Sequence, residues 1–83
     1  MKFEFLTLDY KPAEIGKEER FGFECPKRNG YMCTGLLIRD KGNDVPKKSW
    51  IWNNDREKPT FSPSINCSNC SHGYIENGIW RDA

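Results

Sequence analysis

The chain has 83 residues, of which 36% are hydrophobic and 30% charged, and its 13 basic and 12 acidic residues leave a formal net charge of +1. This balance disfavours a nucleic-acid partner, since nucleic-acid binders normally present a clearly basic face. No apolar run approaches the roughly 18 residues that a membrane span requires, so no membrane partner is expected. The length predicts a single domain over residues 1–83, with much of its surface in contact with water.

Short strands separated by turns are predicted along most of the chain. Aromatic residues at alternate positions indicate the first two, Phe3–Thr7 and Phe21–Cys25, because alternate side chains of a strand point to one face. Between them, Pro12–Arg20 is predicted to be a loop, since Gly16 interrupts its helix signal. Three further strands are expected at Thr34–Ile38, Trp50–Trp52 and Thr60–Asn66. Pro63 implies that the last of these is an edge strand or contains a bulge.

The clearest turn signal lies near the end of the sequence. Tyr74–Glu76 and Ile79–Arg81 flank the dipeptide Asn77-Gly78, which suits the positive φ angles of a two-residue hairpin turn. By contrast, Asp40–Ser49 is polar and is predicted to be a surface loop. The sequence therefore predicts an all-β or β-rich small domain of about six short strands that ends in a β-hairpin.

Four cysteines and one histidine are the candidate metal ligands: Cys25, Cys33, Cys67, Cys70 and His72. Cys67 and Cys70 form a Cys-x2-Cys pair, a spacing that directs two thiolates toward one tetrahedral zinc ion. Cys25 and Cys33 are separated by seven residues and are the weaker half of the signal. We predict that these four cysteines hold one structural Zn²⁺, which would stabilise a chain with little core.

Two alternatives to a four-thiolate zinc site stay open from the sequence alone. The cysteines could form two disulfides, in any of three pairings. His72 could replace one of the thiolates, because imidazole is a common zinc ligand. The N-terminal residues show no secretory signal, so we expect the cytoplasm of a bacterium or of a phage-infected host. Thiols stay reduced there, which favours zinc over disulfides.

Several short motifs together carry a family resemblance. They are Cys25-Pro26, Trp50–Asp55, Pro59–Ile65 and Cys70–Ile75, and the third is the most specific. With these motifs the chain resembles the DUF6527 family of phage and bacterial proteins, from about Phe21 to Trp80. The resemblance implies a small zinc-containing protein and, in the BubE-like branch, a serine peptidase that acts on bacterial ubiquitin-like modifiers. Larger relatives carry another cysteine after the final hairpin, and Cys67 would replace it here.

The family motif also contains two candidate nucleophiles, Ser62 and Ser64. If His72 is not a zinc ligand, its imidazole could act as the general base for one of them. Alternate residues of a strand share a face, so both serines could face His72 if the strand stays regular through the proline between them. Asp55 or Glu57 is the candidate to orient the imidazole ring.

Three functions are compatible with these residues. The first is a hydrolase, a serine-type peptidase with a protein or peptide substrate; the resemblance implies a ubiquitin-like modifier. The second is a non-catalytic, zinc-stabilised protein-interaction module, which the small size favours because little chain remains to build a deep cleft. The third is hydrolysis by the zinc ion itself, which requires an open coordination position that four thiolates do not leave.

Overall fold

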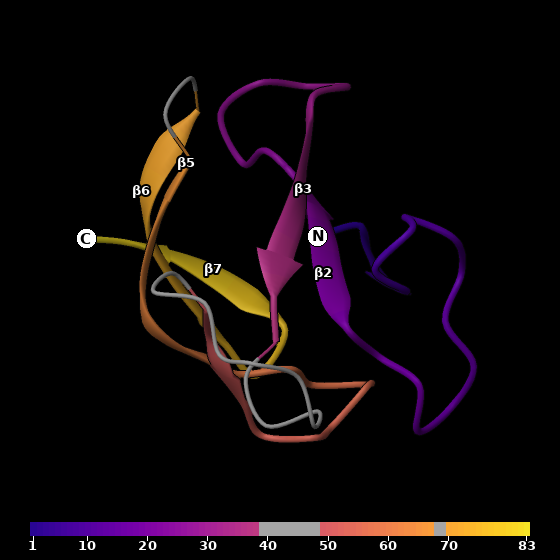
Figure 1. Ribbon diagram of the computed structural model, residues 1–83. Helices are drawn as coiled ribbons and strands as arrows, with labels where there is room; N and C mark the ends of the chain where they lie inside the picture. Colours follow the sequence, from indigo (N-terminus) through magenta and orange to yellow (C-terminus); the bar gives the residue numbers. More distant parts are fainter. Residues whose placement is uncertain (39–48, 68–69) are drawn as a thin grey trace.

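The computed structural model, which describes residues 1–38, 49–67 and 70–83, consists of two antiparallel sheets (Figure 1). The first sheet has the strand order β1-β2-β3, formed by Phe3–Leu6, Arg20–Glu24 and Met32–Leu37. The second has the order β4-β5-β6-β7, formed by Ile51–Trp52, Phe61–Cys67, Ser71–Glu76 and Ile79–Asp82. The described residues contain no helix, so the predicted β-rich class is confirmed. Accordingly, none of their elements is a helix long and apolar enough to cross a membrane.

The strands lie close to the positions that the sequence predicts. Pro12–Arg20 is a loop up to its last residue, where β2 begins. The described part holds seven strands where about six were expected, and β6 already begins at Ser71, directly after the second cysteine pair. Ser49 is buried, although it belongs to the predicted surface loop Asp40–Ser49. The other residues of this predicted loop lie outside the described residues.

Aromatic side chains fill the space between the two sheets. Three ring pairs reach across it, with centroids 4.7, 4.5 and 5.5 Å apart: Phe5–Trp52, Phe21–Phe61 and Phe23–Trp80. Each Phe side chain that is fully buried contributes roughly 1.5–3 kcal/mol to the free energy of unfolding. These contacts therefore hold the sheets face to face, with Trp52 buried in the core and Trp80 packed against it.

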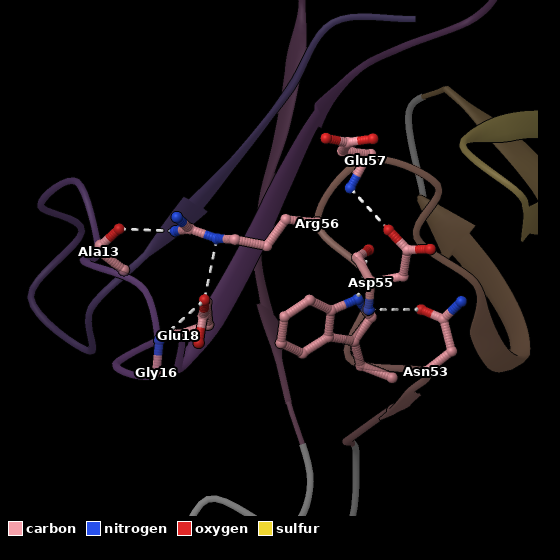
Figure 2. A network of polar contacts seen from close by, with 8 residues as sticks. Ala13, Gly16, Glu18, Asn53, Asp55, Arg56 and Glu57 are labelled. Atoms are coloured by element: carbon pink, nitrogen blue, oxygen red, sulfur yellow. Dashed lines mark hydrogen bonds and ion pairs between the residues drawn. The ribbon is translucent and has the colours of Figure 1, made fainter.

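An ion pair joins the two sheets at one end of this core (Figure 2). Arg56, in the β4–β5 loop, places its Nε 2.9 Å from Oε2 of Glu18, in the β1–β2 loop. The Arg56 Nη2 also donates a hydrogen bond of 2.7 Å to the carbonyl of Ala13. The Glu18 side chain is only 3% exposed and that of Arg56 is 33% exposed, so loss of one partner should cost less than the roughly 3–5 kcal/mol typical of a fully buried pair. The pair therefore fixes the start of β5 against the first sheet.

The predicted hairpin turn is confirmed and is attached to the start of β5. Asn77 and Gly78 have φ angles of 50° and 75°. The Asn77 N–H donates to Thr60 Oγ1 over 2.9 Å, and the Gly78 N–H donates to the Pro59 carbonyl over 2.8 Å. These bonds hold the β6–β7 hairpin beside β5.

Pro63 lies in a bulge of β5. A bulge was one of the two arrangements predicted for this strand, the other being an edge strand. The partners of Phe61 and Ile65 in β6 are Ile75 and Gly73, so four steps along β5 match only two along β6. Phe61 and Ile65 are both buried, which means that the additional residues lie on the outside of the sheet. This bulge decides which of the two candidate serines lies near β6.

Candidate functional site

The outer face of the second sheet carries the candidate catalytic histidine. Burial alternates along β6: the inward residues are Ser71, Gly73 and Ile75, and the outward ones are His72, Tyr74 and Glu76. Successive side chains of a strand point to opposite faces, so His72 projects away from the aromatic core. The imidazole is thus accessible to a substrate that approaches this face.

Ser64 is the serine that lies beside this imidazole. Its Oγ is 3.1 Å from Nε2 of His72, which is hydrogen-bond distance. The strand register explains this contact. Asn66 is the Cα partner of His72, and Ser64 precedes Asn66 by two residues on β5, so Ser64 and His72 are diagonal neighbours on one face. A hydroxyl and an imidazole at this distance have the geometry of a nucleophile and its general base.

Ser62 is positioned differently. It is exposed, and its Cα partner is Ile51 of the short strand β4. The bulge at Pro63 interrupts the regular alternation that would place both serines beside the imidazole. Among the described residues, the serine that contacts His72 is therefore Ser64 and not Ser62.

The two carboxylates expected to orient the imidazole lie in the β4–β5 loop. Oδ1 of Asp55 accepts a hydrogen bond of 2.9 Å from the backbone N–H of Glu57 (Figure 2) and one of 3.0 Å from that of Lys58. These two bonds hold the pKa of the Asp55 carboxyl below its usual value, and the bond from Lys58 has the larger effect. Asp55 therefore stabilises its own turn. Within the described part of the chain, neither it nor Glu57 makes a contact with His72.

The four cysteines lie between the sheets, at the opposite end of the core from the Arg56–Glu18 ion pair. Cys25 follows β2 and Cys33 lies in β3, whereas Cys67 ends β5 and Cys70 precedes β6. They form two pairs at disulfide distance, Cys25–Cys70 and Cys33–Cys67, with Cα–Cα separations of 5.9 and 6.5 Å. Each pair therefore joins one sheet to the other.

The same cluster could hold a metal ion. The sulfur atoms of Cys33, Cys67 and Cys70 lie within 4.8 Å of one another, and the sulfur of Cys25 adjoins that of Cys70. Zinc–sulfur bonds of about 2.3 Å in a tetrahedron would separate the sulfurs by about 3.8 Å, so these three sulfurs have a spacing compatible with zinc ligands, whereas Cys25 lies outside this group of three. Cys67 and Cys70 pack against the core, whereas His72 is exposed beside Ser64.

A tryptophan packs across the inner face of β6 at Gly73, the residue after His72. A Cβ atom at Gly73 would lie only 2.7 Å from Cζ2 of Trp80, so the absence of a side chain at Gly73 lets the indole cross the strand. The Trp80 Nε1–H donates to Oδ1 of Asp82 over 2.9 Å. This bond is the main reason why the pKa of the Asp82 carboxyl is lowered. Trp80 thus ties the end of β7 to the inner side of β6.

Asn66 is a neighbour of His72 in the sheet that was not among the candidates from the sequence. It is exposed, and its Cα pairs with that of His72 across the β5–β6 ladder. The available signal was its spacing of two residues from Ser64, which predicts a shared strand face. The pairing with His72 itself depends on the register between strands, which the sequence does not reveal.

Comparison with known protein families gives one match. The model of a family described as "Bacterial ubiquitination-like system serine protease (BubE)" matches residues 7–83. No curated protein sequence and no solved structure matches the chain. The matched range includes Ser62, Ser64, His72 and all four cysteines. Because the match covers nearly the whole sequence, the chain belongs to the BubE family of bacterial ubiquitination-like system serine proteases.

Proposed function

We propose that this protein is a serine-type peptidase, with Ser64 as the nucleophile and His72 as the general base. The observation that carries the proposal is the 3.1 Å distance between Ser64 Oγ and His72 Nε2 on an accessible sheet face. Membership of the BubE family supports the reaction type and a protein partner. We propose as its substrate a ubiquitin-like modifier, or a conjugate of one, cleaved at a peptide or isopeptide bond.

The reaction follows from the two side chains. Ser64 Oγ attacks the carbonyl carbon of the scissile amide while its proton passes to Nε2 of His72. The imidazolium then donates this proton to the leaving nitrogen, the C–N bond breaks, and an acyl ester remains on Ser64. A water molecule, deprotonated by the same imidazole, attacks the ester. The acid product is released, and the serine hydroxyl is restored.

A cavity beside β5 is the proposed position of the substrate chain. Its volume is about 340 Å³, and its lining includes Trp50 and Ile65–Cys67 from the second sheet and Tyr31–Cys33 from the first. The Nε1–H of Trp50, which lines the cavity, donates to the main-chain carbonyl of Ser64 over 3.2 Å, so the cavity adjoins the backbone of this residue. This volume is at the lower end of the range for binding pockets, so it suits a short extended segment.

We further propose that the four cysteines, when reduced, hold one structural zinc ion. The proximity of cysteine sulfurs from both sheets supports a zinc site. The two pairs at disulfide distance are the alternative for the oxidised protein. Four thiolates leave no coordination position for a water molecule, so we assign hydrolysis to Ser64 and His72. The proposal includes the bacterial cytoplasm, or that of a phage-infected cell, as the location, because thiols stay reduced there.

The test is cleavage of a bacterial ubiquitin-like protein that carries a short C-terminal extension, followed by intact-mass spectrometry. The wild-type protein, prepared with reductant and zinc, should release the extension. His72→Ala should slow cleavage by about 10²–10⁴-fold, the usual contribution of a general base. Glu76→Ala, which changes an exposed residue further along β6, should cleave like the wild type. Specific binding of the modifier by the wild type without cleavage would contradict the proposal and favour an interaction module.

A further inference from the structure

We infer that Asn66 is the third residue of the site and holds the His72 imidazole in the tautomer that the reaction requires. This inference rests on the proposed roles of Ser64 and His72. Asn66 also lines the cavity proposed for the substrate, but the role inferred here acts through the imidazole, so we describe it as a positioning residue. It would take the role for which Asp55 and Glu57 were the candidates from the sequence.

The strand register places Asn66 and His72 side by side on the outer face of the second sheet. Asn66 and His72 are direct Cα partners in the β5–β6 ladder, and both are exposed on the outer face. Side chains of directly opposed residues have Cβ atoms about 4.5–5.5 Å apart. A carboxamide extends far enough from its Cβ to reach a ring at this separation. Since Nε2 contacts Ser64, Nδ1 is the ring nitrogen left for Asn66.

The chemistry of the reaction requires a particular tautomer of this ring. Nε2 can accept the Ser64 proton only if it carries a lone pair, so a neutral imidazole must have its hydrogen on Nδ1. The carboxamide oxygen of Asn66 would accept a hydrogen bond from this Nδ1–H and would thereby stabilise the competent tautomer. The same bond persists when Nε2 becomes protonated, so no proton passes to Asn66.

Asp82 is close in the sheet but lies on the wrong side of it. Its Oδ1 accepts hydrogen bonds from the Trp80 Nε1–H and, over 3.4 Å, from the Ser71 hydroxyl. Ser71 points inward and His72 outward, because neighbouring residues of β6 alternate. The Asp82 carboxylate is therefore held on the face of the sheet opposite to the imidazole.

Glu76 shares the outer face but is too far away. It follows His72 by four residues, which corresponds to about 13 Å along a strand. Its Oε2 also accepts a hydrogen bond of 3.3 Å from Arg81. In contrast, the Asn66 carboxamide makes no hydrogen bond to any described residue, His72 included, so this exposed side chain would form the bond to Nδ1 by rotating toward the ring.

The test combines kinetics with the nitrogen NMR spectrum of the imidazole, which is unambiguous because the chain has one histidine. The wild type should carry its proton on Nδ1. Asn66→Ala should shift the population toward the Nε2–H tautomer and lower kcat by about 10–100-fold with KM unchanged, as loss of a partner that orients a functional imidazole does. Asn66→Asp should retain activity, since a carboxylate accepts the same bond. Asn29→Ala, the same change at an exposed loop residue, should have no effect.

Three outcomes would overturn the inference. If the wild type cleaves and Asn66→Ala matches it in kcat and tautomer, Asn66 has no role while the proposed function stands. If Asn66→Asp is as inactive as Asn66→Ala, the amide acts as a donor and not as an acceptor. A wild type that does not cleave removes the proposed function and this role with it. Should Asn66→Ala fail to fold, Asn66→Ser provides the same comparison with a polar residue too short to reach the ring.

Discussion

Replacing Ser64 with alanine is expected to lower kcat/KM for modifier cleavage by about 10⁴-fold or more, since loss of the nucleophile removes the covalent pathway. Ser62→Ala should remain close to wild type, because Ser62 is opposite Ile51 on the far side of the bulge. The two substitutions are chemically identical and only two positions apart, so each serves as the control for the other. Progress curves at several substrate concentrations give the comparison.

The contrast between the two serines tests the register of β5 as well as the chemistry. If Ser62→Ala is inactive and Ser64→Ala active, the bulge does not place Ser64 beside His72 in solution. The circular dichroism spectrum and the zinc content should be the same for both variants, since neither serine belongs to the buried core. Equal activity of both variants would assign the reaction to neither serine.

Cys70→Ser is expected to leave the chain unfolded when it is prepared under reducing conditions. A hydroxyl is a poor zinc ligand, and losing the metal removes an apparent folding free energy on the order of 10 kcal/mol. That is comparable to the roughly 5–15 kcal/mol by which most small domains are stable. Metal analysis should find about one zinc per wild-type chain and none in the variant, whose amide NMR spectrum should lose its dispersion.

His72→Ala is the matched control for this prediction, because His72 is two residues from Cys70 but lies beside Ser64. It should keep its zinc and its fold. Loss of zinc from this variant would make His72 a ligand and would remove it from the proposed Ser64 reaction. Two findings together would favour the Cys25–Cys70 and Cys33–Cys67 bridges instead. The reduced wild type would contain no zinc, and the oxidised wild type would have a mass lowered by the four hydrogens that two disulfides lose.

Local sequence patterns were sufficient to predict the strands and the final turn. Alternating aromatic residues such as Phe21 and Phe23 reveal a strand because the period of two is a local property. Asn77-Gly78 reveals its turn because the required positive φ angles depend on those two residues. Pro63 likewise indicated an edge or a bulge, and the structure selects the bulge.

Features that depend on contacts between distant segments could not be predicted. The buried pair of Glu18 and Arg56 leaves no local pattern, since each residue alone resembles a solvated surface charge. The division into two sheets and the pairing of Asn66 with His72 depend on how strands align in space. For this reason the sequence offered both Ser62 and Ser64 as nucleophiles and suggested Asp55 or Glu57 as the residue that orients the ring.

Covalent labelling of the nucleophile is the most direct test of a Ser64–His72 peptidase. The folded wild-type protein is incubated with a fluorophosphonate, which reacts with serines activated by a general base. Peptide mapping by mass spectrometry should then place one adduct on Ser64, and His72→Ala should prevent its formation. An adduct on Ser62, or no adduct on protein that is folded and reduced, would contradict the assignment of Ser64 and His72 as nucleophile and base.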